Sequence, residues 1–224
     1  MDDRAHRVDE SCHFPLRWGG IEIETYHGRV RIFLAGASGV IGRHLVPMLV
    51  AEGHVVAGMT RTPSNVESLR SLGAQPVVCD VFDRGLLLEV VARFVPEMVI
   101  HQLTDLPDDA ARVPAQSEAN NRMRREGTTN LVDVAQRRGV RVIAQSVAWP
   151  LPGDGGVAIR FHERTVLDAG GVIVRYGRFF GPGTYFDDEL PPPPRVHVVD
   201  AARRTVAVLD APSGVIEIDE HTPG

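Results

Sequence analysis

The sequence contains no lysine, and all 24 of its basic residues are arginine. This absence excludes Schiff-base chemistry on a lysine amine, proton transfer by lysine, and the lysine of a phosphate-binding loop. Cysteine is almost as scarce: Cys12 and Cys79 fit neither the spacing of a metal site nor a disulfide framework. Two isolated cysteines are typical of a protein kept in a reducing, cytoplasmic setting.

The chain also lacks a surplus of positive charge and a long apolar run. Its formal charge is -5, whereas a surface that binds nucleic acid needs positive charge to neutralise phosphates. No apolar stretch reaches the ~18–20 residues that span a bilayer. The start, Met1–Arg4, has neither the basic nor the apolar part of a secretory signal. We therefore expect a cytoplasmic protein whose partner is a small-molecule substrate, with no nucleic-acid or membrane partner.

What the sequence does contain is an alternation of short apolar runs and stretches with helical spacing. Such runs are typical of buried strands, and strands that alternate with helices imply a parallel sheet covered on both faces. The predicted strands span residues 30–35, 54–59, 75–81, 98–103, 140–146, 171–176 and 215–218, and one of the helices is expected at 158–169. This pattern predicts an α/β fold, a Rossmann-type doubly wound parallel sheet.

A glycine-rich turn, Gly36-Ala-Ser-Gly39-Val-Ile-Gly42, lies between the first predicted strand and the helix that follows it. Gly36 permits the tight turn, Gly39 lets the backbone approach a pyrophosphate, and Gly42 lets the helix pack against the strand. The start of the helix then offers N–H groups and a partial positive charge to phosphates. The predicted dinucleotide site at this turn comprises Gly36, Ser38, Gly39, Val40, Ile41 and Gly42.

The end of the second predicted strand bears on the choice of nucleotide. It reads Thr60-Arg61-Thr62, without the carboxylate that commonly accepts a hydrogen bond from the ribose 2′-hydroxyl of NAD. A guanidinium can pair bidentately with a 2′-phosphate, which a carboxylate would repel. Arg61 therefore favours NADP as the cofactor. NAD is the alternative, and an arginine that merely extends into solvent is the interpretation without function.

The chain divides into three predicted segments. Residues 1–29 show no sustained period and are interpreted as an N-terminal extension. Residues 30–181 carry the glycine turn and the alternating elements, and are the expected NAD(P)-binding Rossmann domain. The pattern loosens after Gly181, so residues 182–224 are expected to form a small C-terminal substrate lobe.

Several motifs accompany the glycine turn: Gly127-Thr-Thr-Asn130, Val142-Ile-Ala-Gln-Ser146, Arg175-Tyr-Gly-Arg-Phe-Phe-Gly-Pro182 and His197-Val-Val-Asp200. Together they resemble the extended or atypical short-chain dehydrogenase/reductases, the epimerase/dehydratase-like branch, over residues 30–219. The resemblance implies that Asp80 and Val81 border the adenine. It also implies that the segment 101–104, with Leu103 and Thr104, borders the riboses of the cofactor. Ser146 falls where the family has a serine or threonine that orients the substrate.

The resemblance breaks at the family's catalytic pair, a tyrosine followed four residues later by a lysine. The lysine lowers the pKa of the tyrosine, so that the phenol can exchange a proton as hydride moves. In this sequence the tyrosines are Tyr26, Tyr176 and Tyr185, and Gly155 and Ile159 occupy the positions that the resemblance assigns to the pair. The family's standard mechanism is therefore excluded.

Two interpretations remain open. A rebuilt site takes its proton from His162, about one turn beyond the missing lysine, from Tyr185, or from a water held by Ser146. The chain is then an oxidoreductase or an epimerase/dehydratase-like enzyme that acts on a small carbonyl or sugar-nucleotide-like substrate. Alternatively the chain is a catalytically silent NADP(H) sensor, as a resemblance to NmrA-like proteins implies.

No metal is expected, because the carboxylate clusters at 108–109 and 187–189 are typical of solvated loops and no histidine stands at ligand spacing. The segment expected to bind the substrate is short. We therefore expect a second copy of the chain to complete the pocket, as in a homodimer.

Overall fold

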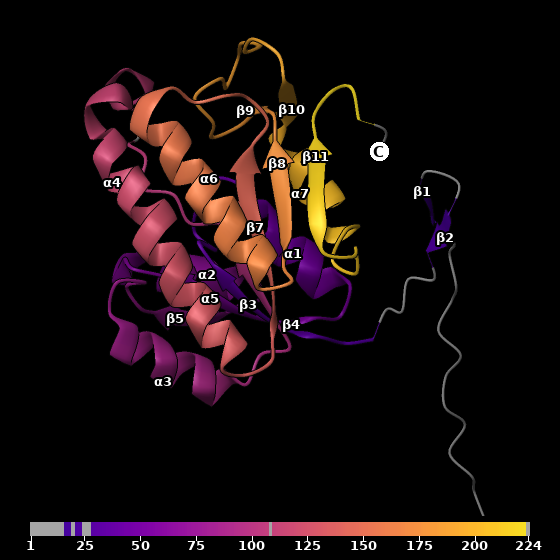
Figure 1. The fold of residues 1–224 in the computed structure, drawn as a ribbon. Coiled ribbons are helices and arrows are strands. Elements are labelled where there is room, and N and C mark those ends of the chain that lie inside the picture. The colour runs from indigo at the N-terminus through magenta and orange to yellow at the C-terminus, as the bar shows by residue number, and fades with distance from the viewer. Residues whose placement is uncertain (1–15, 19–20, 24–27, 108, 223–224) are drawn as a thin grey trace, which may run out of the picture.

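Within the residues that the computed structural model describes, 16–18, 21–23, 28–107 and 109–222, seven parallel strands form the main sheet. Their order is β11-β8-β7-β6-β3-β4-β5 (Figure 1). The chain builds outward from β3 to β5, returns to β6 beside β3, and builds outward in the other direction, which is the doubly wound arrangement. The strands are β3 (Arg31–Ala35), β4 (Val55–Thr60), β5 (Gln75–Val78), β6 (Met98–His101), β7 (Arg141–Val147), β8 (Val172–Tyr176) and β11 (Gly214–Ile218).

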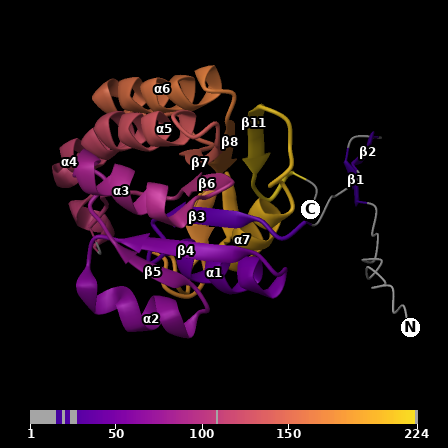
Figure 2. The same cartoon turned by 90° about the horizontal axis from the view of Figure 1, so that it is seen from below.

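Helices cover both faces of the sheet (Figure 2). One face carries α1 (Gly42–Ala51), α2 (Val66–Ser71) and α7 (Val198–Val206), and the other carries α3 (Arg84–Phe94), α5 (Thr128–Gln136) and α6 (Gly153–Asp168). A short helix, α4 (Ser117–Arg122), runs through the π-helical segment Met123–Gly127 into α5. Single 3₁₀ turns lie at Pro63–Asn65, Ala110–Arg112 and Pro114–Gln116.

The central strand β3 shows why the sequence folds this way. Ile32 and Leu34 belong to the core under α1, α2 and α7, whereas Phe33 and Ala35 belong to the core under α3, α5 and α6. Because alternate side chains of a strand point to opposite faces, an uninterrupted apolar run fills both layers. The predicted fold class is confirmed by this sheet.

Two pairs of short strands lie outside the main sheet. β1 (Leu16–Trp18) and β2 (Ile21–Ile23) pair antiparallel inside the predicted extension, the rest of which, apart from residues 28 and 29, falls outside the described residues. β9 (Arg178–Phe180) and β10 (Arg195–His197) pair in parallel. The sequence pattern does not reveal β9 and β10, because three residues are too few for a strand pattern to be recognised.

Helix α6 begins at Gly153 and not at residue 158, where the sequence pattern predicts its start. Glycine disfavours helix, so Gly153-Asp-Gly-Gly156 has the composition of a loop. The structure gives these glycines a packing reason. Gly153 has a φ of +56°, and a Cβ on Gly156 would lie 2.3 Å from the Leu151 carbonyl oxygen. Gly153 is therefore favoured by its backbone conformation, and Gly156 by the lack of space beside Leu151.

The expected C-terminal lobe, residues 182–224, is in large part joined to the main body. Helix α7 buries Val198, Ala202 and Val206 in the same core as α1, and β11 pairs with β8 at the edge of the main sheet. The sequence pattern could not show this, because β11 has no helix after it to mark a further strand–helix unit. What remains outside the sheet is the loop 181–194 with β9 and β10.

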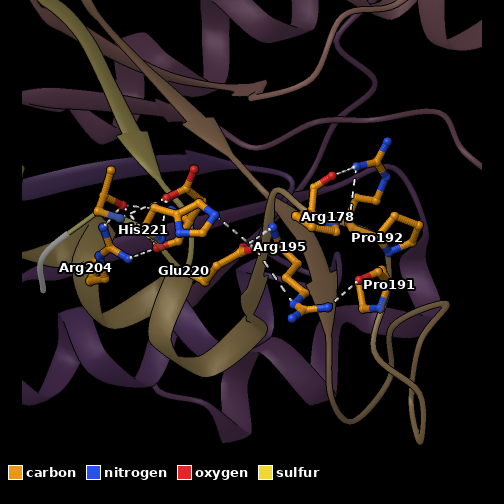
Figure 3. A network of polar contacts seen from close by, with 10 residues as sticks. Arg178, Pro191, Pro192, Arg195, Arg204, Glu220 and His221 are labelled. Atoms are coloured by element: carbon orange, nitrogen blue, oxygen red, sulfur yellow. Dashed lines mark hydrogen bonds and ion pairs between the residues drawn. The ribbon is translucent and has the colours of Figure 1, made fainter.

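Arginine side chains fasten this region to its surroundings (Figure 3). Arg178 Nη1 donates to the Pro193 carbonyl oxygen at 2.9 Å, and Arg195 Nη1 donates to that of Pro191 at 3.0 Å. Arg204 Nη1 donates to the Asp219 carbonyl oxygen at 2.8 Å. These bonds join β9, β10 and α7 to the proline-rich loop and to the turn that follows β11.

Candidate functional site

The carboxyl ends of β3 and β6 define the place where a ligand is expected. These two strands are neighbours, with Ala35 opposite His101, and their crossovers run to opposite faces of the sheet. A crevice opens outside the strand ends at such a switch point. The glycine turn lies directly above it, between the end of β3 and the start of α1.

The outer glycines of the turn are required by the packing of the protein itself. Gly36 has a φ of +90°, and a Cβ there would lie 2.6 Å from the Gln102 carbonyl oxygen. A Cβ on Gly42 would lie 2.3 Å from the Gly36 carbonyl oxygen. A Cβ on Gly39 would lie 3.2 Å from the Gly36 carbonyl oxygen, a tight contact but a less severe one than at the two outer glycines. A bare backbone there leaves room for a ligand above the helix start.

An open cleft of about 140 Å³ follows the ends of β3 to β6. This volume is below the roughly 300–1,000 Å³ of typical ligand pockets, so the cleft accommodates only part of a dinucleotide. Eight of the predicted cofactor residues line it: Gly36, Ser38, Gly39, Arg61, Asp80, Val81, Leu103 and Thr104.

Three other predicted cofactor residues do not line the cleft. Val40 is exposed, Ile41 is 4% exposed and packs in the core, and Gly42 lies beneath the turn. Their backbone amides at the helix start remain the predicted phosphate donors.

Gln102 and Met123 are among the further residues that line the cleft, and Gln102 lies in the segment 101–104 that the resemblance places at the riboses. Gln102 follows β6, and its Oε1 is buried with no hydrogen-bond partner among the described residues. Because this unpaired acceptor is buried, it can receive a sugar hydroxyl only where a bound ligand reaches it. Met123 comes from the connection between β6 and β7, and no motif in the sequence marks it.

Arg61 has an acidic partner that the sequence does not reveal. Its Nη1 and Nη2 donate to Asp105 at 3.2 and 2.9 Å. The hydrogen bond with Asp105 raises the pKa of the Arg61 guanidinium. Asp105 is 44 residues away in the chain, and its own amide is held by Asn120 Oδ1 at 3.0 Å. The expectation of an arginine without a nearby carboxylate is therefore corrected, because the loop after β6 brings one.

Ser146 is buried and bound to a carboxylate. Its hydroxyl donates to Glu163 Oε1 at 2.6 Å, and Arg175 pairs bidentately with the same carboxylate at 2.9 and 2.7 Å. Burial would raise the pKa of Glu163, but the hydrogen bonds from Arg175 and Ser146 outweigh it and lower the pKa. Because the Ser146 hydroxyl donates its hydrogen bond to the Glu163 carboxylate, its oxygen can accept a hydrogen bond from a ligand or a water, but its hydrogen is already engaged.

His162 lies in the protein core, 2% exposed. A chain of hydrogen bonds fixes its tautomer. The Leu103 amide donates to His101 Nδ1 at 3.2 Å, so His101 Nε2 donates to Thr128 Oγ1 at 3.1 Å. Thr128 then donates to His162 Nδ1 at 2.6 Å, and His162 Nε2 donates to the Gln145 carbonyl oxygen at 2.8 Å.

His101 and His162, the two histidines of this hydrogen-bond network, are neutral. Burial lowers the pKa of His162 to about 4 and that of His101 well below its usual range. Gln145 Nε2 donates to the Leu103 carbonyl oxygen at 3.0 Å, so the hydrogen-bond network returns to the residue at which it began. The network therefore holds both the amide and the carbonyl group of Leu103, which lines the cleft. Both ring nitrogens of His162 are engaged in it, so neither is left for a substrate.

Tyr185 stands in the loop after β9. Its hydroxyl donates to the Pro107 carbonyl oxygen, and the side chain is 41% exposed. The bond ties the loop 181–187 to the loop that follows β6. Ser146 and His162 lie together where α6 contacts β7, Tyr185 lies apart in the loop after β9, and none of the three lines the cleft.

A second cavity, of about 460 Å³, lies beside β10 and α7 and contains none of the predicted site residues. Arg195, Arg203 and Arg204 line it together with the carboxylates of Asp200, Asp219 and Glu220. Within the described part of the chain, no three His, Cys, Asp or Glu side chains are grouped as metal ligands. No helix among the described residues is both long and apolar enough to cross a membrane.

Comparison with known proteins decides the family. Residues 32–166 match the sequence profile of the NAD dependent epimerase/dehydratase family, which is more than half of the chain. The chain belongs to this family. The prediction made from the glycine turn and the later motifs is thereby confirmed, as is the prediction of an NAD(P)-binding protein of the oxidoreductase or epimerase/dehydratase type.

Similarity to one named relative extends over most of the chain. A protein of a Streptomyces species named 3-diazoavenalumate denitrifying reductase is 33% identical over 241 residues, which cover 87% of this chain and 77% of that protein.

Solved structures of the family share the fold. UDP-glucose 4-epimerase of Thermus thermophilus, in complex with NAD, aligns with a TM-score of 0.70 and 16% identity, over 84% of this chain and 77% of the epimerase. The UDP-Glc/GlcNAc 4-epimerase of Campylobacter jejuni aligns with a TM-score of 0.71 and 16% identity, over 85% and 78%. At this identity the likeness concerns the fold alone.

Proposed function

We propose that this protein is an NADP(H)-dependent reductase whose substrate accepts a hydride without receiving a proton from the protein. The observation that carries the proposal is the state of the three side chains on which the candidate proton donors depend. Ser146 donates to Glu163, His162 has both ring nitrogens occupied, and Tyr185 donates to Pro107. A carbonyl or epimerase reaction needs such a donor for the oxygen that becomes charged. A substrate that loses a neutral leaving group does not.

Aryl diazo compounds are such substrates. When a hydride adds to the ring carbon that carries a diazonium group, the carbon–nitrogen bond breaks and dinitrogen leaves with the bonding electrons. The charges balance, since a cationic arene and a hydride give a neutral arene and N₂, and no proton is consumed. The name of the Streptomyces relative, a denitrifying reductase of a diazo acid, supports this substrate class. We therefore propose an aromatic diazo acid as the substrate.

The residues of the cleft fit a nicotinamide dinucleotide. The bare backbone at Gly39 and the amides at the start of α1 would hold its pyrophosphate, and Asp80 and Val81 would border its adenine. The orphan Oε1 of Gln102 would accept a hydrogen bond from a ribose hydroxyl. When reduced, this cofactor supplies the hydride. Thr104 and the braced Leu103 would keep its second half at the ends of β6 and β7.

NADP is the proposed form of the cofactor, and Arg61 carries that preference. Its side chain is 54% exposed at the cleft, so a 2′-phosphate can reach the guanidinium. Asp105 occupies the same donors in the structure. The phosphate would therefore have to displace this carboxylate or share the arginine with it, and the affinity for NADP would be the difference between the two ion pairs.

The second candidate function is the silent NADP(H) sensor. The same observation favours it, because a protein that only binds NADP(H) and catalyses no reaction requires no proton donor. The two functions differ in one measurable respect: the reductase consumes NADPH when a diazo acid is present, whereas the sensor binds NADPH and consumes none.

The test is to incubate the protein with NADPH and two sets of compounds, diazonium derivatives of hydroxybenzoic and hydroxycinnamic acids, and matched aldehydes and ketones. We expect oxidation of NADPH, one dinitrogen per NADPH and the deaminated arene with the first set, and no turnover with the second. Turnover of carbonyls alone would contradict the proposal. Tight binding of NADPH without turnover in either set would favour the sensor.

The control must separate enzymatic from spontaneous reduction, because diazonium ions are reactive. Gly39→Ala places a methyl group in the cleft, and Gly85→Ala places one where its nearest neighbour, Asp83 Oδ1, is 3.6 Å away. We expect Gly39→Ala to lose the NADPH-dependent rate and Gly85→Ala to keep it.

A homodimer is proposed as the state of the protein in solution. Val157 and Phe161 support it, because they lie one turn apart on α6 and are 49% and 44% exposed. Sedimentation of wild type and Phe161→Asp tests the proposal: a dimer that becomes a monomer is expected, and a wild-type monomer would contradict it.

A further inference from the structure

Arg124 is a half-buried cation for which no carboxylate within the described residues serves as partner. Its Nη1 donates to the neutral oxygen Oδ1 of Asn121 at 3.3 Å. Burial lowers the pKa of its guanidinium to about 10. Other arginines at this end of the sheet are paired: Arg61 with Asp105, and Arg175 with Glu163.

The nearest acidic residue on α6 is already engaged. Asp154 accepts hydrogen bonds from Arg125 and, at 3.0 Å, from Nδ2 of Asn121. Asn121 is 4% exposed, and because its amide nitrogen is committed to Asp154, its oxygen faces Arg124. The asparagine thus stands between cation and carboxylate and holds the guanidinium in place without neutralising it.

The backbone at Arg124 is unusual as well. Met123–Gly127 forms a π-helical turn between α4 and α5, and such turns are rare and frequent at functional sites. Contacts made by residues before and after Arg124 show which element this face of the helix packs against. Asn121 bonds to Asp154, and Thr128 bonds to His162, so the face that carries Arg124 is turned toward α6.

This position belongs to the second half of the site. The helix that carries Arg124 descends from the loop after β6, and α6 descends from the end of β7, so the first turns of both lie at the carboxyl edge of the sheet. A Cβ on Gly155 would lie 3.9 Å from Asn121 Oδ1. Through Asn121 the arginine therefore stands near Gly155, one of the two positions where the resemblance places the missing catalytic pair.

A cation withdrawn from water without an anion is costly, and removing such a charge often stabilises a protein. Sites that sacrifice stability in this way are typically binding sites. We propose that Arg124 binds an anionic oxygen of the substrate, the carboxylate or phenolate of an aromatic acid, at the nicotinamide end of the cleft. The location of the reaction rests on the proposed function, whereas the charge of the ligand rests on Arg124 itself.

Binding without turnover tests this. The probes are 4-hydroxycinnamate, cinnamate, which keeps only the carboxylate, and 4-hydroxycinnamamide, which keeps only the phenol, each titrated calorimetrically in the presence of NADP⁺. We expect Arg124→Met to weaken the binding of the anion that pairs with Arg124 by about tenfold or more. Arg124→Lys should recover part of the affinity. Arg93→Met, which removes an exposed arginine paired with Glu89 on α3, should change nothing.

Stability supplies the second readout. A structural arginine would leave Arg124→Met less stable than wild type, whereas we expect an equal or higher melting temperature without ligand. The proposal is overturned by a clear loss of stability, by equal affinities in wild type and Arg124→Met, or by a wild type that binds none of the anionic probes. If these bindings depend on Arg124 but no diazo compound is reduced, the inference stands and the proposed reductase falls.

Discussion

The two halves of the sheet's carboxyl edge are built on different principles. At the ends of β3, β4 and β5 the cleft is formed by bare backbone at the glycine turn and by side chains that reach into solvent, such as that of Arg61. At the ends of β6, β7 and β8 the polar side chains are bound to one another: Ser146 to Glu163, and His162 to Thr128 and Gln145.

The contrast indicates how the work is divided. The first half is open and suits a ligand held by amides and one guanidinium. The second half is closed in the sense that its polar side chains are bonded to one another, so this half can position a cofactor but these side chains offer it no proton. The ends of β6, β7 and β8 would thus position the cofactor without donating a proton, which suits hydride transfer to a carbon that carries a neutral leaving group.

The largest effect is expected where the open half depends on backbone. Gly36→Ala forces a side chain into a φ of +90° and within 2.6 Å of the Gln102 carbonyl oxygen. We expect a loss of about 3 kcal/mol in the free energy of unfolding, measured in urea, and no detectable NADPH binding. Wild-type affinity in this variant would mean that the turn does not hold the dinucleotide.

The second effect concerns Arg61 and Asp105. Arg61→Ala should weaken NADPH binding by about 10- to 100-fold, the value of a charge-assisted hydrogen-bond pair, and leave NADH nearly unchanged. Asp105→Asn should act in the opposite direction and tighten NADPH binding, because the guanidinium loses its competitor. Calorimetry with both cofactors measures this. Equal losses for NADPH and NADH in Arg61→Ala would remove the basis for NADP.

The third effect is a pH dependence of stability from the closed half. The folded pKa of His162 is about 4, below the usual 6.5 of the unfolded chain. The unfolded state therefore takes up a proton first, and the contribution of His162 to stability falls as the pH drops from about 6.5 toward 4, by roughly 1 kcal/mol per unit. Thermal unfolding between pH 7.5 and 5 measures the slope. His162→Gln should reduce the slope and leave the part that comes from His101, whose pKa burial also lowers, whereas His221→Gln, with a 77% exposed side chain, should leave the slope unchanged.

The smallest effects are expected at the residues that would have been proton donors. Tyr185→Phe should leave the rate of the hydride step within about threefold of wild type, and the same holds for Ser146→Ala once a loss of about 1 kcal/mol in stability is allowed for. Single-turnover kinetics with NADPH and a diazo acid measure that step. A loss of a hundredfold or more in either variant would restore a protein acid and remove the contrast between the two halves.

The open half could be predicted because its signals are local. Gly36, Gly39 and Gly42 stand within one turn, and the apolar runs of β3 and β4 identify strands by themselves. Arg61 is recognisable for the same reason, since it directly follows β4.

The closed half could not be predicted, because its determinants are pairs that lie far apart in the chain. Helical spacing places His162 near the missing lysine, but its partner Thr128 is 34 residues away and draws the ring into the core. Asp105 and Arg124 carry no motif at all. Only the fold shows that the first has an arginine as its partner and that the second has no carboxylate among the described residues.

The origin of the hydrogen in the product tests the central claim most directly. NADPH carrying deuterium at one or the other of its two transferable positions is supplied with a diazo acid in ordinary water, and the arene is examined by mass spectrometry and NMR. We predict deuterium from only one of the two positions, on the ring carbon that carried the diazo group. Hydrogen drawn from water at that carbon, or deuterium from both positions alike, would contradict the account.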